Sequence, residues 1–422
     1  MFNANNTSNF GEFIYNLVND FYCSYILKSS KPQNNQWTVI SSIVLENNNR
    51  YKVICFSNGT KSLPNMNYKS RKFQIFDCHA EILVLKCFKF FLLNALCFHI
   101  DKNNSKKLLS QSEFNLFKLN EEFYDIFEFN NDNKKFKLKP SIKFHLYISS
   151  DPCGECANIK YNNNKGINLY EMTGSKTIEE ILNFNDTSIN TNNMKYKFRT
   201  KSLRSDYKIN TISYSLSCTD KIMLKNILGY QGKYLNLILD KIFINSLIIN
   251  SELNNTKNNI NSYKECLNYN SRKNFLNYES YIPEIYLLNK NENEIKNIND
   301  KNSLPFSSYW YFPNFIKKVD PVNGVKTGGN IKDVKNIDFL RVKISNYDLC
   351  SNIFNFMINN KDLFPKKIKK MKKYMINKDD FDCYDLIGFL VDNEYINIKT
   401  NIINENEDIK NFLGKKRKIL NI

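Results

Sequence analysis

The sequence predicts an α/β fold, because short strand-like runs alternate along the chain with longer stretches of helical periodicity. Runs rich in β-branched and aromatic residues occur at 37–45 (WTVISSIVL), 51–57 (YKVICFS) and 142–149 (IKFHLYIS). Between the second and third runs, the pattern from Cys78 to about Phe98 is helical. With 422 residues, 42% of them hydrophobic, the chain can bury a substantial core.

The N-terminal segment is expected to be an amphipathic helix. The string Asn9 to Glu12 resembles a capping box, and aromatic or aliphatic residues then recur every fourth position up to Tyr25. The first two strand-like runs follow, and the short connection ENNNR between them favours a hairpin.

The most apolar run of the chain, from Cys87 to Phe98, is expected to be a buried helix. Lys89 and Asn94 interrupt this run, and it is too short to span a bilayer. No association with a membrane is therefore predicted.

Two Asn-rich stretches, at 161–196 and 251–303, have weak periodicity and are interpreted as low-complexity inserts. No internal repeat divides the chain. We therefore expect residues 1–422 to form a single domain that carries these two inserts.

Composition favours an intracellular protein that interacts with a polyanion. The formal net charge is +18, although much of the lysine lies beside asparagine, so charge alone indicates nucleic-acid binding only weakly. The 11 cysteines form no regular framework and no secretory signal opens the chain, which favours a reducing compartment. The string GKKRK at 414–418 is a candidate nuclear import signal, so the expected location is the nucleus, the cytoplasm or both.

Two short motifs together predict a metal centre. His79 and Glu81 stand in FDCHAE, and Cys153 and Cys156 stand in DPCGEC, each where a helix is expected to begin; Pro152 suits the first turn of such a helix. One histidine and two thiolates leave the fourth position of a tetrahedral zinc ion open, which is the catalytic arrangement. A structural Cys₂His₂ site would need another histidine, and the chain has only three.

Glu81 is the expected acid–base group of this centre. Zinc lowers the pKa of bound water from ~15.7 toward ~7, and a carboxylate that is not a ligand can then move protons. The order H-x-E…P-C-x-x-C is typical of nucleobase deaminases, in which water attacks the ring carbon that carries the amino group.

A third motif extends this interpretation to a known family. Residues 215–232 read SLSCTDKIMLKNILGYQG. With DCHAEI, FHLYISSDPCGEC and GTK (59–61), they resemble the adenosine-to-inosine editase domain shared by tRNA adenosine deaminases and double-stranded-RNA adenosine deaminases. The resemblance runs from Trp37 to about Leu239 and continues more weakly through 308–329. It implies a cytidine-deaminase-like α/β/α sandwich with a mixed central sheet and a C-terminal helical extension, and a hydrolase that converts adenosine to inosine.

Within this family, the chain most resembles the tRNA-specific adenosine deaminase 1 type, which deaminates adenosine 37 beside the anticodon of tRNA-Ala. No double-stranded-RNA-binding domain fits before Trp37, and FRTKSLRSD (198–206) resembles a loop of the tRNA enzymes. The resemblance therefore implies tRNA as partner, bound through Arg199, Lys201 and Arg204, and no protein partner is inferred.

The same resemblance changes the expected ligand set. In the family the third metal ligand is the cysteine of SC[ST]DK, which maps onto Cys218. The expected zinc ligands are thus His79, Cys153 and Cys218, with Glu81 catalytic and Cys156 a spare thiol. A site that uses Cys156 in place of Cys218 remains the alternative.

The resemblance also implies a buried inositol hexakisphosphate. Such a polyanion needs a shell of cationic and hydroxyl donors. The positions that match are Lys61, Lys86, Lys221, Gln231, Tyr374, Lys378 and Tyr384. The Lys-rich string FPKKIKKMKKY (364–374) is interpreted either as an RNA phosphate contact or as a solvated helix face.

Three other functions remain open on the sequence. The first is deamination of another RNA or of free nucleosides, and the second is RNA binding by a catalytically inactive relative. The third is a structural zinc protein. Formation of inosine in tRNA-Ala, and its loss in a Glu81→Ala variant, would separate these possibilities.

Overall fold

The structure is a computed structural model that describes residues 7–63, 73–104, 108–159, 175–177, 198–201, 215–271, 278–289, 302–328 and 340–376. Several predicted positions lie outside these ranges: Arg204, Lys378, Tyr384, the string 414–418 and, apart from 175–177, the insert at 161–196.

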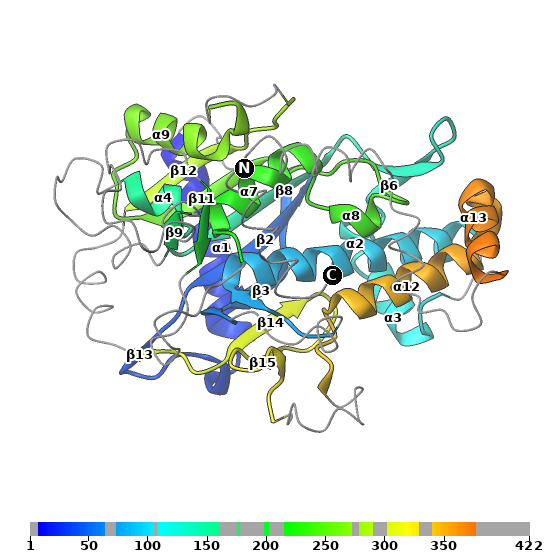
Figure 1. Cartoon of the computed structure of the whole chain (residues 1–422), viewed down its shortest axis with the longest axis horizontal. Helices are drawn as coiled ribbons and strands as arrows, with labels where there is room; N and C mark the ends of the chain where they lie inside the picture. Colours follow the sequence, from blue (N-terminus) through cyan, green and yellow to red (C-terminus); the bar gives the residue numbers. More distant parts are fainter. Residues whose placement is uncertain are drawn as a thin grey trace, which may run out of the picture.

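An eight-stranded mixed sheet forms the centre of the fold (Figure 1). In spatial order its strands are β12 (Glu284–Asn289), β11 (Ser246–Ser251), β8 (Ile142–Ile148), β2 (Ile40–Asn47), β3 (Arg50–Asn58), β14 (Ser307–Tyr311), β15 (Lys317–Asp320) and β16 (Val325–Lys326). β12, β11 and β8 are parallel to one another, and each further pair from β8 to β16 is antiparallel.

Helices and two-stranded ribbons surround the sheet. The helices are α1 (Thr7–Tyr25), α2 (Ala80–Asn104), α3 (Gln111–Lys118), α4 (Glu155–Asn158), α7 (Cys218–Leu228), α8 (Gly232–Leu235), α9 (Lys257–Leu267), α12 (Asn346–Asn359) and α13 (Pro365–Ile376), with the 3-10 turns η1 (Lys28–Ser30), η3 (Glu121–Phe123), η6 (Tyr269–Ser271) and η7 (Lys361–Leu363). The ribbons are β1 (Gln36–Trp37) with β13 (Asn302–Ser303), β4 (Thr60–Ser62) with β5 (Asp77–His79), β6 (Phe127–Asn130) with β7 (Lys135–Leu138) and β9 (Ser175–Thr177) with β10 (Arg199–Lys201).

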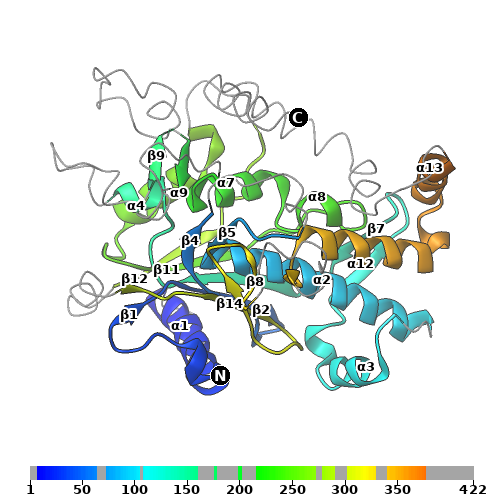
Figure 2. The ribbon, with the colours of Figure 1, turned by 60° about the horizontal axis from the view of Figure 1, so that its bottom comes forward.

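The two faces of the sheet carry different helices, so the domain has three layers (Figure 2). α1 packs on one face, across β12, β11, β8, β2 and β3, and α2 packs on the other, across β2, β3 and β14. Side chains alternate along each strand: Ile43 and Leu45 of β2 enter the core under α2, whereas Val44 enters the core under α1. The expected α/β fold with a mixed central sheet is confirmed.

The predicted hairpin is present as β2 and β3. Asn48 and Asn49 form its turn with φ of 50° and 61°. Asparagine tolerates this left-handed conformation, and two such residues make a turn whose twist matches that of the strands. At the N-terminus, the predicted capping box is wrong, because α1 begins at Thr7 and Asn9 lies within it.

α2 is the buried helix that the apolar run predicted, although it is longer than that run. Its 25 residues pass between the sheet and helices α8 and α12. By length and composition its segment Ala80–Asn103 is apolar enough to cross a membrane, with a mean hydropathy of 1.7, but 72% of that window is buried inside the protein. The helix is therefore a core element of this fold.

The described part of the predicted insert at 251–303 belongs to the folded domain. β12 is a strand of the central sheet and pairs in parallel with β11 over six residues. α9, which precedes it, buries Tyr263, Cys266 and Leu267. For these residues, the interpretation as a low-complexity insert is wrong.

Candidate functional site

His79 is the last residue of β5, and α2 begins directly after it. The ribbon of β4 and β5 fixes this junction, since Thr60 pairs with His79 in the register. Glu81 consequently lies in the first turn of α2. The first motif thus places an imidazole and a carboxylate together at the start of a buried helix.

Cys153 lies in the turn that leaves β8, before α4 begins at Glu155. The prediction that Pro152 opens this helix is therefore wrong by three residues. Gly154 makes the turn possible: its φ is +106°, and a Cβ at this position would lie 2.3 Å from the hydroxyl oxygen of Ser217. A glycine here lets the turn approach the start of α7.

Cys218 is the first residue of α7, and Ser217 caps the helix by accepting a hydrogen bond from the Asp220 amide. The backbone N–H of Cys218 donates to Cys153 Sγ at 3.3 Å. The Thr219 amide donates to the carbonyl of Cys153 at 3.1 Å. These contacts fasten the Cys153 turn to the positive end of α7, where a thiolate is stabilised.

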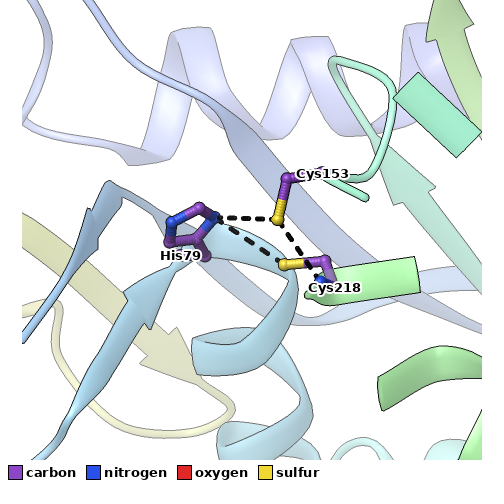
Figure 3. A group of neighbouring side chains, drawn as sticks. All are labelled: His79, Cys153 and Cys218. Carbon is purple, nitrogen blue, oxygen red and sulfur yellow. Dashed lines mark hydrogen bonds between the residues drawn. The ribbon is translucent and has the colours of Figure 1, made fainter. Parts of the chain in front are cut away.

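The side chains of His79, Cys153 and Cys218 converge from these three elements (Figure 3). His79 Nδ1 lies 3.9 Å from Cys153 Sγ and 3.7 Å from Cys218 Sγ, and the three donor atoms all lie within 4.8 Å of one another. A tetrahedral ion with Zn–S of ~2.3 Å and Zn–N of ~2.0 Å requires sulfur and nitrogen roughly 3.5 Å apart. The cluster therefore fits a metal ion of this type.

The pKa values of the two thiols of the cluster shift in opposite directions. A hydrogen bond from Cys218 lowers the pKa of Cys153 well below its usual value, and Lys201 and His79 lower it further. Burial raises the pKa of Cys218. Of the two thiols, Cys153 is therefore the one whose surroundings favour the thiolate more. A bound metal ion would favour thiolate at both positions.

Glu81 lies beside this cluster in a buried position, and the residue is 3% exposed. Among the described residues, no group donates a hydrogen bond to its Oε2 atom. Burial raises the pKa of this carboxyl, although the charges of His79 and Lys201 oppose the effect. An unpartnered buried carboxylate oxygen is costly, and here it is available to a ligand.

A buried network of ion pairs lies against the cluster and contacts Cys218. Lys201 Nζ lies 2.8 Å from Asp77 Oδ1 and 3.0 Å from Cys218 Sγ, and Lys221 Nζ also contacts Asp77. Burial alone would lower the pKa of Lys201, but the negative groups Asp77, Cys218 and Cys153 raise it. Likewise, burial would raise the pKa of Asp77, but Lys201 and Lys221 lower it. Both charges are thus held in place.

Two of the predicted RNA contacts are wrong, because both side chains are buried in ion pairs. Lys201 is 2% exposed and pairs with Asp77, and Arg199 is also 2% exposed and bonds Glu155 Oε2 through its Nε at 3.0 Å. Buried, ion-paired cations cannot reach RNA phosphates. The sequence did not lead us to identify Asp77 as part of the site. Its position two residues before His79, in DCHAE, was the signal that could have indicated it.

Cys156 is buried, and its sulfur is not a member of the three-residue group found among the described residues. The geometry thus favours Cys218 over Cys156 as the third donor. The other two histidines have partners elsewhere: His145 Nε2 lies 2.9 Å from Glu46, and His99 Nδ1 lies 3.0 Å from Asp125.

Five of the seven predicted polyphosphate residues lie in the part of the chain that the structure describes. Burial and the charge of Lys221 lower the pKa of Lys86 to about 8. Lys86 and Lys221 are therefore close enough to repel each other, and a bound anion would stabilise both charges. Lys61 lies in β4 and Tyr374 in α13. Gln231 corrects the prediction: its amide nitrogen donates to Leu228 O and Asn236 Oδ1, so both donor hydrogens are used inside the protein.

Comparison with known proteins gives a consistent family. Residues 55–388 match the adenosine-deaminase (editase) domain. tRNA-specific adenosine deaminase 1 of Schizosaccharomyces pombe is 28% identical over 222 residues, 51% of this chain and 49% of that protein. Double-stranded RNA-specific editase B2 of Mus musculus is 27% identical over 205 residues, 47% of this chain and 25% of that protein. tRNA-specific adenosine deaminase 1 of Saccharomyces cerevisiae is 24% identical over 248 residues, 53% of this chain and 54% of that protein.

The chain spans about half the length, or less, of these curated relatives. The matched segment 55–388 contains all three donor residues of the cluster as well as Glu81.

Proposed function

Because the chain belongs to the adenosine-deaminase (editase) domain family, we propose that it converts adenosine to inosine in tRNA by hydrolytic deamination. The observation that carries this proposal is the convergence of His79, Cys153 and Cys218 beside Glu81, whose Oε2 has no hydrogen-bond partner among the described residues. A metal site with an open position and a free acid–base group is the equipment that hydrolysis of a C–N bond requires.

We propose zinc as the metal, held by the His79 imidazole and the thiolates of Cys153 and Cys218. The donor set supports this choice, since one nitrogen and two sulfurs suit Zn²⁺ better than the hard cations, which prefer oxygen. When bound, the ion supplies the Lewis acidity that activates a water molecule at neutral pH.

Glu81 is the proposed proton carrier. Its carboxylate accepts a proton from the attacking water and delivers that proton to N1 of the adenine, which makes C6 more electrophilic. The oxygen–C6 bond then forms. Glu81 takes the remaining proton from the new hydroxyl on C6 and passes it to the amino group, and C6=O forms as the C6–N6 bond breaks and ammonia leaves. The raised pKa of this buried carboxyl supports the role, because a proton must be held and released near neutral pH.

Lys201 and Asp77 are proposed as positioning residues. Lys201 lies against Cys218 Sγ and balances the negative charge that two thiolates bring into a buried site. Asp77 fixes the lysine in place and also accepts a hydrogen bond from the His79 amide at 3.1 Å. The network thereby holds both the histidine backbone and one thiol.

The proposed substrate is the anticodon loop of tRNA, and in particular adenosine 37 of tRNA-Ala. The resemblance to the tRNA-specific enzymes supports this choice, as do the printed names of two of the relatives. A single-stranded loop also lowers the free energy needed to extrude the base into a buried site. As a cofactor, we propose inositol hexakisphosphate near Lys86 and Lys221, whose neighbouring charges would be stabilised by a buried anion.

The test is incubation of the full chain with a tRNA-Ala transcript, followed by sequencing for inosine. The same protein is also offered a perfect RNA duplex and free adenosine. We expect inosine in the tRNA, none with Glu81→Ala, and loss and recovery of activity on chelation and re-addition of Zn²⁺. Inosine only in the duplex or only from free adenosine would reject the proposed substrate, and activity that Glu81→Ala retains would reject the mechanism.

A further inference from the structure

We propose that the exposed lysines of α13 form a second RNA contact that binds phosphates of the tRNA body, far from the adenosine site. This inference rests on the proposed function, because it identifies a part of the substrate beyond the reacting loop. It concerns a segment to which the proposed mechanism assigns no role.

α13 has an unusual density of one charge. Its sequence is PKKIKKMKKYMI, in which six of twelve residues are lysine and none is acidic. Lysine and arginine together make up 60 of the 422 residues of the chain, so the bias of the whole sequence does not account for this helix.

The helix is docked on the protein and displays these lysines to solvent. Ile368 and Met371 are buried. Lys366, Lys369 and Lys370 are exposed, and within the part of the chain that the structure describes no carboxylate forms an ion pair with them. Their exposure makes these three lysine side chains accessible to an anion in solution.

The arrangement is unfavourable for the helix itself. Lys366 has lysines both three and four positions further on, and like charges at these spacings repel one another on a helix surface. Lysines in the first turn also oppose the positive end of the helix dipole. Alternating positive and negative side chains would stabilise a helix that faces only solvent. On α13, a bound polyanion would remove the repulsion among the lysines and release counterions.

The start of α13 packs near the hairpin formed by β6 and β7. The Phe136 ring of β7 lies 6.4 Å from the Phe364 ring, which immediately precedes α13. Lys134 in the turn of this hairpin is also exposed, and its ammonium lies 6.0 Å from the centre of the Phe129 ring. Asp362 on η7 offsets one charge near the helix start. We define the distal basic surface as Lys361, Lys366, Lys369 and Lys370.

The distal basic surface is far from the metal cluster. α2 starts directly after His79 and runs for 25 residues, which corresponds to about 37 Å. α12 packs along α2, and both views place α13 beyond the end of α12 that lies away from α4 (Figures 1 and 2). RNA whose adenosine occupies the site would therefore reach α13 only with a part that lies well beyond the reacting loop.

The experiment measures binding of whole tRNA-Ala and of its isolated anticodon stem-loop by fluorescence anisotropy at several salt concentrations. The variant is Lys369→Gln/Lys370→Gln, in which glutamine keeps helix propensity. The matched control is Lys28→Gln/Lys118→Gln, which removes two exposed lysines on other elements. Circular dichroism and thermal unfolding check that each variant folds.

For whole tRNA, we expect the α13 variant to bind roughly tenfold more weakly, with the slope of log K against log salt reduced by about 1.5. Binding of the stem-loop and of the control variant should not change. Unchanged tRNA binding, an equal loss on the stem-loop, or an equal loss in the control would each overturn the inference.

Inosine formation is measured beside binding, which keeps the two proposals distinguishable. Inosine in tRNA together with unchanged affinity of the α13 variant overturns the α13 contact alone. Absence of inosine with the unmodified chain overturns the proposed function, whatever the variant binds.

Discussion

Lys201→Met tests whether the buried network supports the metal cluster. Methionine keeps the length and apolar body of the side chain but removes the ammonium, which bonds both Asp77 and Cys218 Sγ. The substitution leaves the Asp77 carboxylate buried with Lys221 as its remaining cation. The position thus isolates the contribution of one charge.

The expected loss of unfolding free energy is about 3 kcal/mol. Removing one partner of a buried ion pair costs about 3–5 kcal/mol, because the other charge stays desolvated. The lower figure applies here, since Lys221 still contacts Asp77. Asp77→Asn in the same protein removes the charge that Lys201 would otherwise neutralise. The double variant should therefore lose less than the sum of the two single losses, with a coupling of about 2 kcal/mol.

Urea unfolding of the four proteins, followed by intrinsic fluorescence, measures this coupling. Zinc content after dialysis is measured in parallel, and we expect Lys201→Met to retain less zinc than Lys201→Arg, which keeps the charge. Additive losses across the cycle, or equal zinc retention in the two Lys201 variants, would refute the reasoning that the ion pair holds the thiol of Cys218.

Three further predictions address other parts of the account. Cys218→Ser should lose most bound zinc and inosine formation while Cys156→Ser keeps both, and metal analysis that finds the reverse would assign the third ligand to Cys156. Gly154→Ala should destabilise the protein by about 2–4 kcal/mol in urea unfolding, because a methyl group meets Ser217 and the backbone is left-handed; a loss below about 0.5 kcal/mol would contradict this geometry. Asp125→Asn should cost about 1–2 kcal/mol at pH 7, because burial raises the pKa of this carboxyl but hydrogen bonds from Lys102, His99 and Lys139 lower it by more. That difference should shrink as the pH falls below about 4, the unfolded pKa, and a difference that grows toward acid would contradict the assigned sign.

The donors of the candidate site were predictable because each stands in a short motif tied to a structural junction. His79 ends a strand and Cys218 starts a helix, and the chemistry of zinc requires such side chains to meet. The hairpin was predictable for a similar local reason, since β-branched runs flank an asparagine turn.

The burial of Arg199 and Lys201 and the position of strand β12 could not be predicted, because both depend on partners that are distant in sequence. Arg199 and Lys201 read as a basic, RNA-facing string, yet the carboxylates of Glu155 and Asp77 draw them into the interior. The strand Glu284–Asn289 was missed because it is short and lies among asparagines. Its pairing with β11, and not its own pattern, makes it part of the sheet.

The measurement that tests the metal centre most directly is X-ray absorption spectroscopy of the zinc-loaded full chain. We expect two sulfur scatterers at ~2.3 Å and two nitrogen or oxygen scatterers at ~2.0–2.1 Å, with one sulfur replaced in Cys218→Ser and none in Cys156→Ser. A first shell of three or four sulfurs, or a shell without sulfur, would contradict the centre formed by His79, Cys153 and Cys218.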